Sequence, residues 1–233
     1  ERFGQSGEKA SKVNIAIPEG QQKLVSELAK TGKPVIALVM CGRPVIFNEI
    51  REHADAVLCT WWLGSEAGNA ICNVLWGEYN PSAKLPITFP AHVGQIPIYY
   101  QNKSTGRPTA LKQTYKASYI DASTEPAYPF GYGLSYTDFG YSDLKLLPGK
   151  AAGVHTEVSV KVTNTGKCAG EEVVQLYVQD KVASVTRPIK ELKGFRKIHL
   201  NAGESKTVVF QITDDALGFY DNEMNYMVEP GDF

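Results

Sequence analysis

The sequence predicts a multi-domain protein, in which a partial α/β sandwich with a parallel-type sheet and helices is followed by an all-β sandwich. Up to about residue 79, apolar strand-like runs alternate with helix-like segments, which is the α/β pattern. From Phe139 onward apolar residues recur at every second position in several segments. Turn residues separate these segments at intervals of about ten residues, as in sandwiches of the immunoglobulin or fibronectin type III sort. A length of 233 residues allows one large domain or two small ones.

The first part is expected to contain three helices and two strands. The helices are expected over residues 18–32, 47–53 and 64–76. Pro18 suits the first position of a helix, and Gly32 suits the position that ends one. The apolar run 34–40 does not alternate, so it predicts a strand that is covered on both faces, as in a parallel sheet. Residues 54–61 predict a second strand of the same kind.

Residues 96–138 are expected to connect the α/β domain, residues 1–95, to the sandwich domain, residues 139–233. The connector is rich in Pro, Gly and Tyr and has no sustained period, which is typical of linking or functional segments. It contains an aromatic and glycine cluster, residues 128–136, without a charged side chain. Packing of the two domains by these rings is therefore favoured over a binding site.

The sandwich domain carries well-marked strand signals. Residues 157–163 alternate strictly and end at the turn signal Asn164-Thr-Gly166. Further strands are expected over residues 173–178, 193–200, 206–212 and 224–228. The sequence after residue 228 reads as a turn into a strand, so the domain is expected to be truncated at Phe233. A Cys-Trp-Cys framework is absent, which argues against an antibody-like domain.

Composition excludes several classes of protein. Lys plus Arg number 24 and Asp plus Glu number 25, and this balance argues against binding of nucleic acid. No apolar run approaches the roughly 18 residues of a membrane helix, so no membrane partner is expected. The four cysteines show neither a C-x-x-C pair nor zinc-like spacing with the histidines, so no metal site is predicted. They are expected to be inert thiols, with a Cys41–Cys59 disulfide as the alternative.

The residues themselves offer few candidates for catalysis. The motifs G-x-S-x-G, G-x-G-x-x-G and H-E-x-x-H and the P-loop are absent. Glu8, in Ser6-Gly-Glu8, lies in a polar stretch from which a glutamate can reach a cleft and exchange a proton. By spacing alone a solvated Glu8 is favoured. Glu66 falls at the start of a helix, where capping is the favoured role.

A series of motifs runs through the chain in a fixed order. These are Gly42-Arg-Pro44, Gly64-Ser-Glu-Ala-Gly68, Gly77-Glu-Tyr-Asn-Pro-Ser-Ala-Lys-Leu-Pro86, Gly94-Gln-Ile-Pro-Ile-Tyr-Tyr100, Thr105-Gly-Arg-Pro108, the cluster 128–136, Asn164-Thr-Gly166, Arg187-Pro188 and Lys193-Gly-Phe195. Together they resemble the second domain and the C-terminal fibronectin type III-like domain of family-3 glycoside hydrolases. Within that family they are most similar to the bacterial periplasmic β-glucosidases. The resemblance covers almost the whole chain in the right order, so it is highly specific.

The resemblance implies a fold and an activity. The family consists of a (β/α)8 barrel, an α/β sandwich and a fibronectin-like domain, so this chain is expected to hold the last two, the first of them incomplete. The implied activity is that of a retaining, exo-acting β-glycosidase, foremost a β-glucosidase, that removes terminal non-reducing β-linked sugars from an oligosaccharide or aryl β-glycoside. The nucleophilic Asp would come from the N-terminal barrel. The resemblance implies no cofactor or metal, and a periplasmic or secreted location.

The resemblance also assigns a role to Glu8. The family's acid/base glutamate often stands in a Ser-Gly-Glu context, which Ser6-Gly-Glu8 matches, so Glu8 is the candidate acid/base. Lys12 stands where the family often has Arg, and Asn14 where Asp is common, and Glu1 is the rival carboxylate. The alternative function is a non-catalytic carbohydrate-binding or scaffold module. In that case Trp61 and Trp62 would stack on sugar rings, although packing is favoured because Trp61 ends a buried strand.

Overall fold

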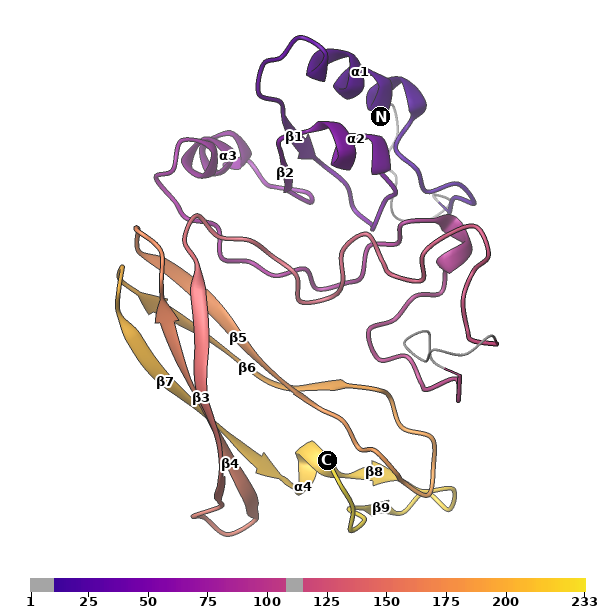
Figure 1. Ribbon diagram of the computed structural model, residues 1–233, viewed down its shortest axis with the longest axis vertical. Coiled ribbons are helices and arrows are strands. Elements are labelled where there is room, and N and C mark those ends of the chain that lie inside the picture. Colours follow the sequence, from indigo (N-terminus) through magenta and orange to yellow (C-terminus); the bar gives the residue numbers. More distant parts are fainter. Residues whose placement is uncertain (1–10, 108–114) are drawn as a thin grey trace. The chain divides into compact units, whose positions relative to one another are not determined.

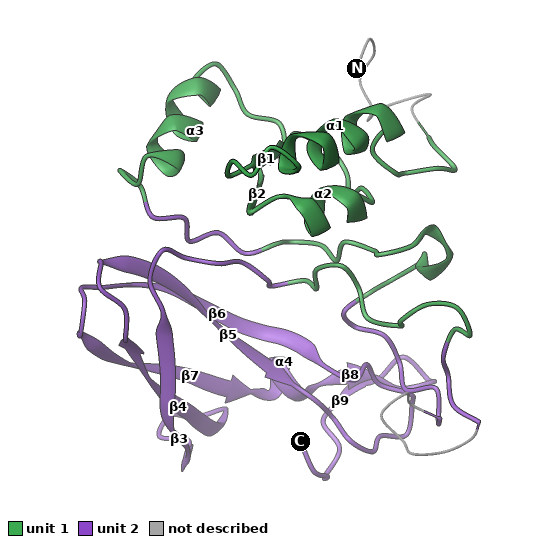
Figure 2. Cartoon of the chain, turned by 45° about the horizontal axis from the view of Figure 1, so that its top comes forward, with its two compact units in different colours: residues 1–79, 85–99, 119–130 green, residues 80–84, 100–118, 131–233 purple. Residues whose placement is uncertain are grey.

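The computed structural model describes residues 11–107 and 115–233, which fold into two compact units (Figures 1 and 2). The first unit takes the chain up to Tyr79 together with Leu85–Tyr99 and Tyr119–Phe130. The second unit takes Asn80–Lys84, Tyr100–Ser118 and Gly131–Phe233. Each unit is therefore built from segments that are separated in the sequence. No helix in the described part of the chain is long and apolar enough to cross a membrane.

The first unit is an α/β fold around a small parallel sheet. Strands β1 (Ile36–Val39) and β2 (Ala56–Cys59) pair in parallel, and Val39 lies opposite Cys59. The helices are α1 (Glu19–Ala29), α2 (Asn48–His53), α3 (Ala67–Leu75) and the 3-10 helix η1 (Val93–Gln95). Helix α1 begins directly after Pro18, and Gly32, two residues after the C-cap Lys30, has a positive φ of 70° that suits glycine in the turn after the helix. The predicted helices and strands of this part are confirmed.

One face of this small sheet carries the core of the first unit. This core contains the buried residues Val39, Cys41, Val45, Phe47, Ile50 and Phe89. The ring of Phe47 contacts Phe89 edge-on and stacks on Tyr128, with ring centroids 6.0 Å apart in both pairs. Tyr128, from the predicted aromatic cluster, thus packs within the first unit. The residues that follow it from Gly131 onward belong to the second unit.

The expectation that both strands are covered on both faces is wrong for the described residues. Ile36, Leu38 and Met40 are 52%, 39% and 59% exposed, whereas Val39 is buried. Strand β2 also has no fully buried residue. The physical reason is that the buried cluster formed with α2 lies on the Val39 side of β1, and the described residues do not bury the opposite side.

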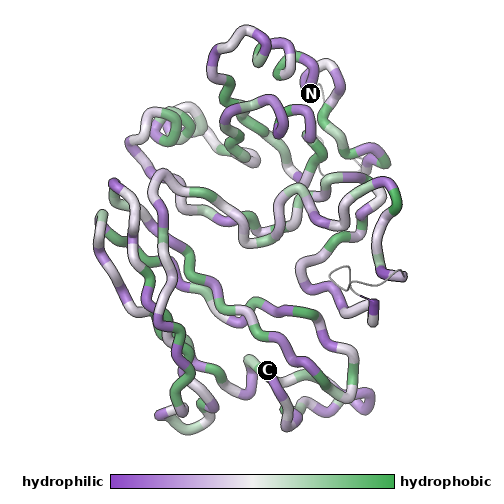
Figure 3. The backbone as a smooth tube through the Cα atoms, in the orientation of Figure 1, coloured by the Kyte–Doolittle hydropathy of each residue, from purple (hydrophilic) through white to green (hydrophobic). Residues whose placement is uncertain are grey.

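The second unit is a β-sandwich, as predicted. One sheet has the order β3-β4-β7 and the other pairs β5 with β6, in both cases antiparallel. The strands are β3 (Phe139–Pro148), β4 (Val154–Asn164), β5 (Gly170–Val178), β6 (Glu191–Leu200) and β7 (Ser205–Thr213), followed by the short helix α4 (Asp214–Leu217) and the hairpin β8 (Phe219–Tyr220) and β9 (Tyr226–Met227). Hydrophobic and hydrophilic residues alternate along the long strands (Figure 3). This alternation gives each sheet one apolar face.

The two sheets of the sandwich share one apolar core. It contains Val162 from β4, Val174 from β5, Leu200 from β6 and Phe210 from β7. In the described residues β5 pairs with β6 along one edge only. Just beyond the end of β5, the Lys181 amide donates a hydrogen bond of 3.1 Å to the Asp232 carbonyl oxygen.

Asn164, the last residue of β4, is fully buried and holds the turn after the strand. Its side-chain oxygen accepts hydrogen bonds from the Thr137 hydroxyl at 2.7 Å and the Gly166 amide at 3.1 Å. Its side-chain nitrogen donates to the carbonyl oxygens of Cys168 at 2.8 Å and Leu200 at 3.1 Å. Asn164→Ala would leave these groups unpaired, and we expect it to lower the free energy of unfolding by about 2–3 kcal/mol.

Urea denaturation of the variant checks this expectation. Asn201 is exposed and provides the matched control, because Asn201→Ala should change the free energy of unfolding by less than about 0.5 kcal/mol. Equal midpoints for the two variants would show that the buried amide does not stabilise the turn.

Candidate functional site

The candidate acid/base Glu8 and its rival Glu1 lie outside the described residues. The segment that follows Glu8 joins the first unit through an isolated parallel β-bridge between Ala16 and Ile46. The Ile17 amide donates to the Ile46 carbonyl oxygen at 2.9 Å, and the Ile46 amide donates to the Ile15 carbonyl oxygen at 3.1 Å. The chain that leads away from Glu8 is therefore attached to the loop between β1 and α2.

Trp61 and Trp62 follow β2, at the carboxyl end of the parallel sheet. Trp61 has a left-handed backbone with φ of 55°, which is uncommon for a residue other than glycine. Its ring packs edge-on against Phe89, with centroids 5.6 Å apart, and contacts the first core. Trp62, by contrast, is 57% exposed. The structure confirms the packing role predicted for Trp61 and leaves the Trp62 ring accessible.

Trp62 contributes to a groove of about 540 Å³ along β1. Leu38, Met40 and Arg43 also line the groove, together with Gln21 from α1. Ligands of open α/β sheets bind at the carboxyl ends of the strands, so the position suits a binding surface. No Asp or Glu stands among the described residues that line it, and these residues therefore cannot supply a carboxylate for acid/base catalysis.

Glu66 occupies the position that precedes the first turn of α3. Its carbonyl oxygen accepts a hydrogen bond of 3.0 Å from the Ala70 amide, while its carboxylate accepts one of 2.6 Å from the Asn69 side chain. Glu66 stands at the predicted position before the helix, but the capping role predicted for its side chain is wrong. The carboxylate binds a side-chain amide and forms no hydrogen bond with the backbone of the helix.

The cysteines differ in their surroundings. All four are free thiols, and Cys41 is buried, Cys59 is half-buried, and Cys72 and Cys168 are exposed. Cys72 is exposed although it lies in an apolar segment of the sequence. Cys59 is the last residue of β2, and Cys41 follows the end of the neighbouring strand β1 by two positions.

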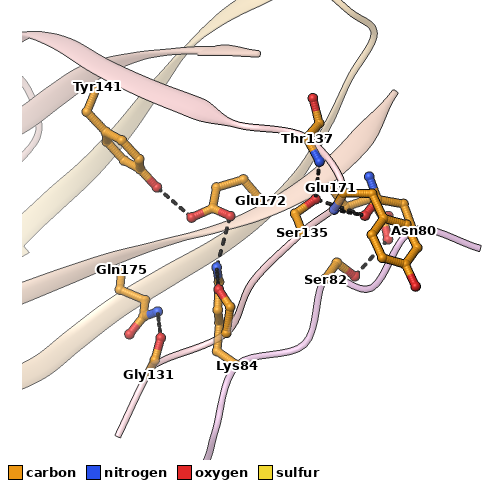
Figure 4. A network of polar contacts seen from close by, with 12 residues as sticks. Asn80, Ser82, Lys84, Gly131, Ser135, Thr137, Tyr141, Glu171, Glu172 and Gln175 are labelled. Atoms are coloured by element: carbon orange, nitrogen blue, oxygen red, sulfur yellow. Dashed lines mark hydrogen bonds and ion pairs between the residues drawn. The ribbon is translucent and has the colours of Figure 1, made fainter. Parts of the chain in front are cut away.

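A network of polar contacts in the second unit connects Asn80–Lys84 to β5 (Figure 4). Lys84 forms an ion pair of 3.1 Å with Glu172, and its ammonium group also donates to the Gly133 carbonyl oxygen at 2.9 Å. The Tyr141 hydroxyl, from β3, donates to the other oxygen of Glu172 at 2.9 Å. Burial, together with the Glu172 carboxylate, raises the pKa of Tyr141 above its usual range. The carboxylate of Glu172 is thus compensated by a cation and a hydroxyl donor.

Two further anchors extend this network along the same segment. The Ser82 hydroxyl donates to Glu171 at 3.2 Å, and Glu171 also pairs with Lys197 at 2.6 Å. The Asn80 side chain donates to the Ala169 carbonyl oxygen and accepts from the Ser135 hydroxyl at 2.9 Å. Alternate residues of Asn80–Lys84 therefore each bind the sandwich unit.

The glycines of the aromatic cluster fit closely into the same unit. A Cβ atom on Gly133 would lie 2.2 Å from the Ala83 carbonyl oxygen, so only glycine fits at this position without displacement of the backbone. Gly131 has a φ of 81°, and its carbonyl oxygen accepts a hydrogen bond of 3.0 Å from Gln175. The second half of the cluster therefore binds to the sandwich through its backbone.

Sequence reasoning did not identify Lys84, Glu171 or Glu172. The sequence did contain a sign of the Glu172 ion pair. Glu172 and Val174 are two positions apart in β5, so both side chains point toward the apolar face of the strand. A charge at such a position requires a partner. The network holds a segment in place, and it contains no arrangement of nucleophile and base. Among the described residues, no group of three or more His, Cys, Asp or Glu could hold a metal ion.

Comparison with known proteins finds a matching domain family for each of the two parts of the chain. Residues 2–136 match the model of the glycosyl hydrolase family 3 C-terminal domain, and residues 172–233 match a fibronectin type III-like domain. A periplasmic β-glucosidase of Salmonella typhimurium is 49% identical over all of this chain, and a β-xylosidase of Formosa agariphila is 44% identical over 97% of it. In each case the match covers 31% of the relative.

Solved structures give the same picture. The crystal structure of a β-glucosidase from Listeria innocua in complex with glucose superposes with a TM-score of 0.92 at 42% identity. The match covers 97% of this chain and 32% of that protein. The chain therefore spans about a third of the length of the relatives that it matches.

Proposed function

Because the chain belongs to glycosyl hydrolase family 3, we propose that it is the C-terminal part of a retaining, exo-acting β-glycosidase, foremost a β-glucosidase. The match along the whole chain to a periplasmic β-glucosidase carries this proposal. The substrate would be a terminal non-reducing β-linked sugar of an oligosaccharide or an aryl β-glycoside. The name of the Salmonella relative also supports a periplasmic or secreted location.

In this proposal two parts of the protein share the chemistry. Retention needs two carboxyl groups about 5–5.5 Å apart, one to attack the anomeric carbon and one to protonate the leaving oxygen. An Asp of the N-terminal (β/α)8 barrel would be the nucleophile, and Glu8 would donate the proton and then accept one from water. The backbone pairing of Ile15 and Ile17 with Ile46 supports this role, because it fixes the chain that follows Glu8.

The exposed face of β1 supports the expectation that the α/β domain is incomplete in this chain. Ile36, Leu38 and Met40 form a row of exposed apolar side chains along the strand. Burial of apolar surface contributes about 25 cal/mol per Å², so a stable domain is expected to cover this row. We propose that residues of the same protein that precede Glu1 supply the cover.

An assay of the complete protein on an aryl β-glucoside tests the proposal. We expect turnover with the β-anomer of the sugar as the first product, followed by NMR. The present chain alone should show no turnover, because it lacks the proposed nucleophile. The α-anomer as first product would contradict retention, and turnover by the chain alone would contradict a nucleophile on the barrel.

The exposed Trp62 favours one alternative, a non-catalytic carbohydrate-binding module. An accessible aromatic ring in a groove can stack on a sugar. This alternative predicts that the chain alone binds an oligosaccharide, that Trp62→Ala abolishes this binding, and that the complete protein does not hydrolyse glycosides.

A further inference from the structure

Cys41 and Cys59 form a close pair inside the first unit. Val39, the last residue of β1, is the direct neighbour of Cys59 across the sheet, and Cys41 follows two positions later. Cys41 belongs to the buried apolar core of this unit, and Cys59 packs against the same core. Side chains two positions apart along a strand point to the same side, so Cys41 and Cys59 lie on the same side of the small sheet, next to the ends of neighbouring strands.

We propose that Cys41 and Cys59 are a redox-active dithiol that low-molecular-weight disulfides oxidise to an intramolecular disulfide. Such a bond would join the carboxyl ends of β1 and β2. Neither cysteine has a part in the proposed glycosidase chemistry, so this inference does not depend on it.

The surroundings of the two thiols assign a role to each. Cys59 is half-buried, whereas Cys41 is only 8% exposed, so an incoming oxidant reaches Cys59 more readily. Hydrogen bonds from the Cys41 thiol and, less strongly, from the Trp61 amide outweigh burial and lower the pKa of Cys59 to about 7. The hydrogen bond with Cys59 and burial raise the pKa of Cys41 above its usual range. A thiolate is the attacking species in disulfide exchange, so Cys59 is the first nucleophile.

The reaction balances in two exchange steps. The Cys59 thiolate attacks one sulfur of glutathione disulfide, which breaks that S–S bond, releases one glutathione thiolate and leaves a mixed disulfide on Cys59. Cys41 then gives its proton to the released thiolate and attacks the Cys59 sulfur, which expels the second glutathione. The two protein thiols are oxidised, and one glutathione disulfide is reduced to two glutathione molecules.

The other two cysteines serve as matched controls. Cys72 lies on α3, and the Cys168 thiol contacts the Tyr136 carbonyl oxygen at 3.5 Å. Both are exposed, and they belong to different units. They should form mixed disulfides with glutathione and no disulfide with each other.

The experiment treats the purified protein with glutathione disulfide, blocks the remaining thiols and maps the peptides without reduction. We expect a Cys41–Cys59 cross-linked peptide that is lighter than the two free peptides by the mass of two hydrogen atoms. Oxidation should also raise the melting temperature of the protein that carries Cys72→Ser and Cys168→Ser by about 5–10 °C, because the bond closes a loop between neighbouring strands.

Single variants distinguish the roles of the two thiols. Cys41→Ser should leave Cys59 carrying one glutathione, and Cys59→Ser should leave Cys41 unmodified in the folded protein. Recovery of both cysteines of the unsubstituted protein as blocked thiols or separate mixed disulfides would overturn the proposal. A cross-link that forms only in urea would do the same, and neither result depends on whether the variants fold.

Discussion

Glu8→Gln in the complete protein is expected to slow the hydrolysis of β-glucosides with poor leaving groups by about 10²–10⁴-fold. The amide cannot donate a proton to the departing oxygen. An aryl glycoside with an acidic phenol needs no such proton, so its glycosylation step should be much less affected. The measurement is kcat/KM for a series of glycosides with leaving groups of different acidity. A steeper dependence on leaving-group acidity in the variant than in the parent protein is the expected result.

The same variant should also lack the base for the second step. A glycosyl-enzyme is therefore expected to accumulate with activated substrates, and azide, which needs no general base, should restore turnover and yield a β-glycosyl azide. The corresponding Glu1→Gln protein is the matched control and should keep parental rates. If instead Glu8→Gln is unchanged and Glu1→Gln loses activity, the role belongs to Glu1.

Lys84→Met is expected to destabilise the second unit by about 3–5 kcal/mol. Lys84 and Glu172 are largely buried, with side chains 16% and 11% exposed. Without Lys84 the Glu172 carboxylate keeps the hydrogen bond from the Tyr141 hydroxyl but loses the cation that pairs with it among the described residues, so its charge is left uncompensated in a largely buried position. Urea denaturation monitored by a probe in the sandwich measures the loss.

Two controls separate this effect from the general cost of removing a lysine. Lys30 forms an ion pair of 2.7 Å with Glu27 on the surface of α1, and Lys30→Met should cost less than about 1 kcal/mol. The double variant Lys84→Met and Glu172→Leu removes both charges and should recover much of the stability, because apolar replacements of a buried pair are often neutral. A double variant that is no more stable than Lys84→Met would show that the charge on Glu172 is not the source of the loss.

Local signals in the sequence predicted most of the secondary structure. Pro18 and Gly32 bracket α1, and the strict alternation over residues 157–163 falls within β4. These signals depend on residues close together in the chain, such as helix caps, turns and the period of the apolar residues. They are therefore readable without knowledge of the tertiary contacts.

Local signals could not predict that each unit combines segments that are separated in the sequence. The residues of Asn80–Lys84 bind partners on and beside β5 that lie far along the chain, and no local pattern indicates such a contact. The sequence suggested contiguous domains over residues 1–95 and 139–233, whereas the chain passes between units at Asn80 and again at Leu85. The burial of β1 was overestimated because an apolar run shows that a strand can be covered and does not show which residues cover it.

The candidate site was predictable only through resemblance. Ser6-Gly-Glu8 has no feature that distinguishes it from a solvated loop, and the motifs of the rest of the chain gave it significance. The Cys41–Cys59 pair was open as an alternative, because spacing cannot tell which strands are neighbours. The parallel register of β1 and β2 supplies that information.

The buried carboxylate of Glu172 also bears on aggregation. In the described residues β5 pairs with another strand along one edge only, and an open edge can pair with a strand of a second molecule. A charge that points inward from such a strand makes this pairing costly, because an incoming chain that displaces Lys84 or Tyr141 would leave the carboxylate without its partners. We therefore expect loss of the ion pair between Lys84 and Glu172 to make pairing of β5 with a strand of a second molecule less costly.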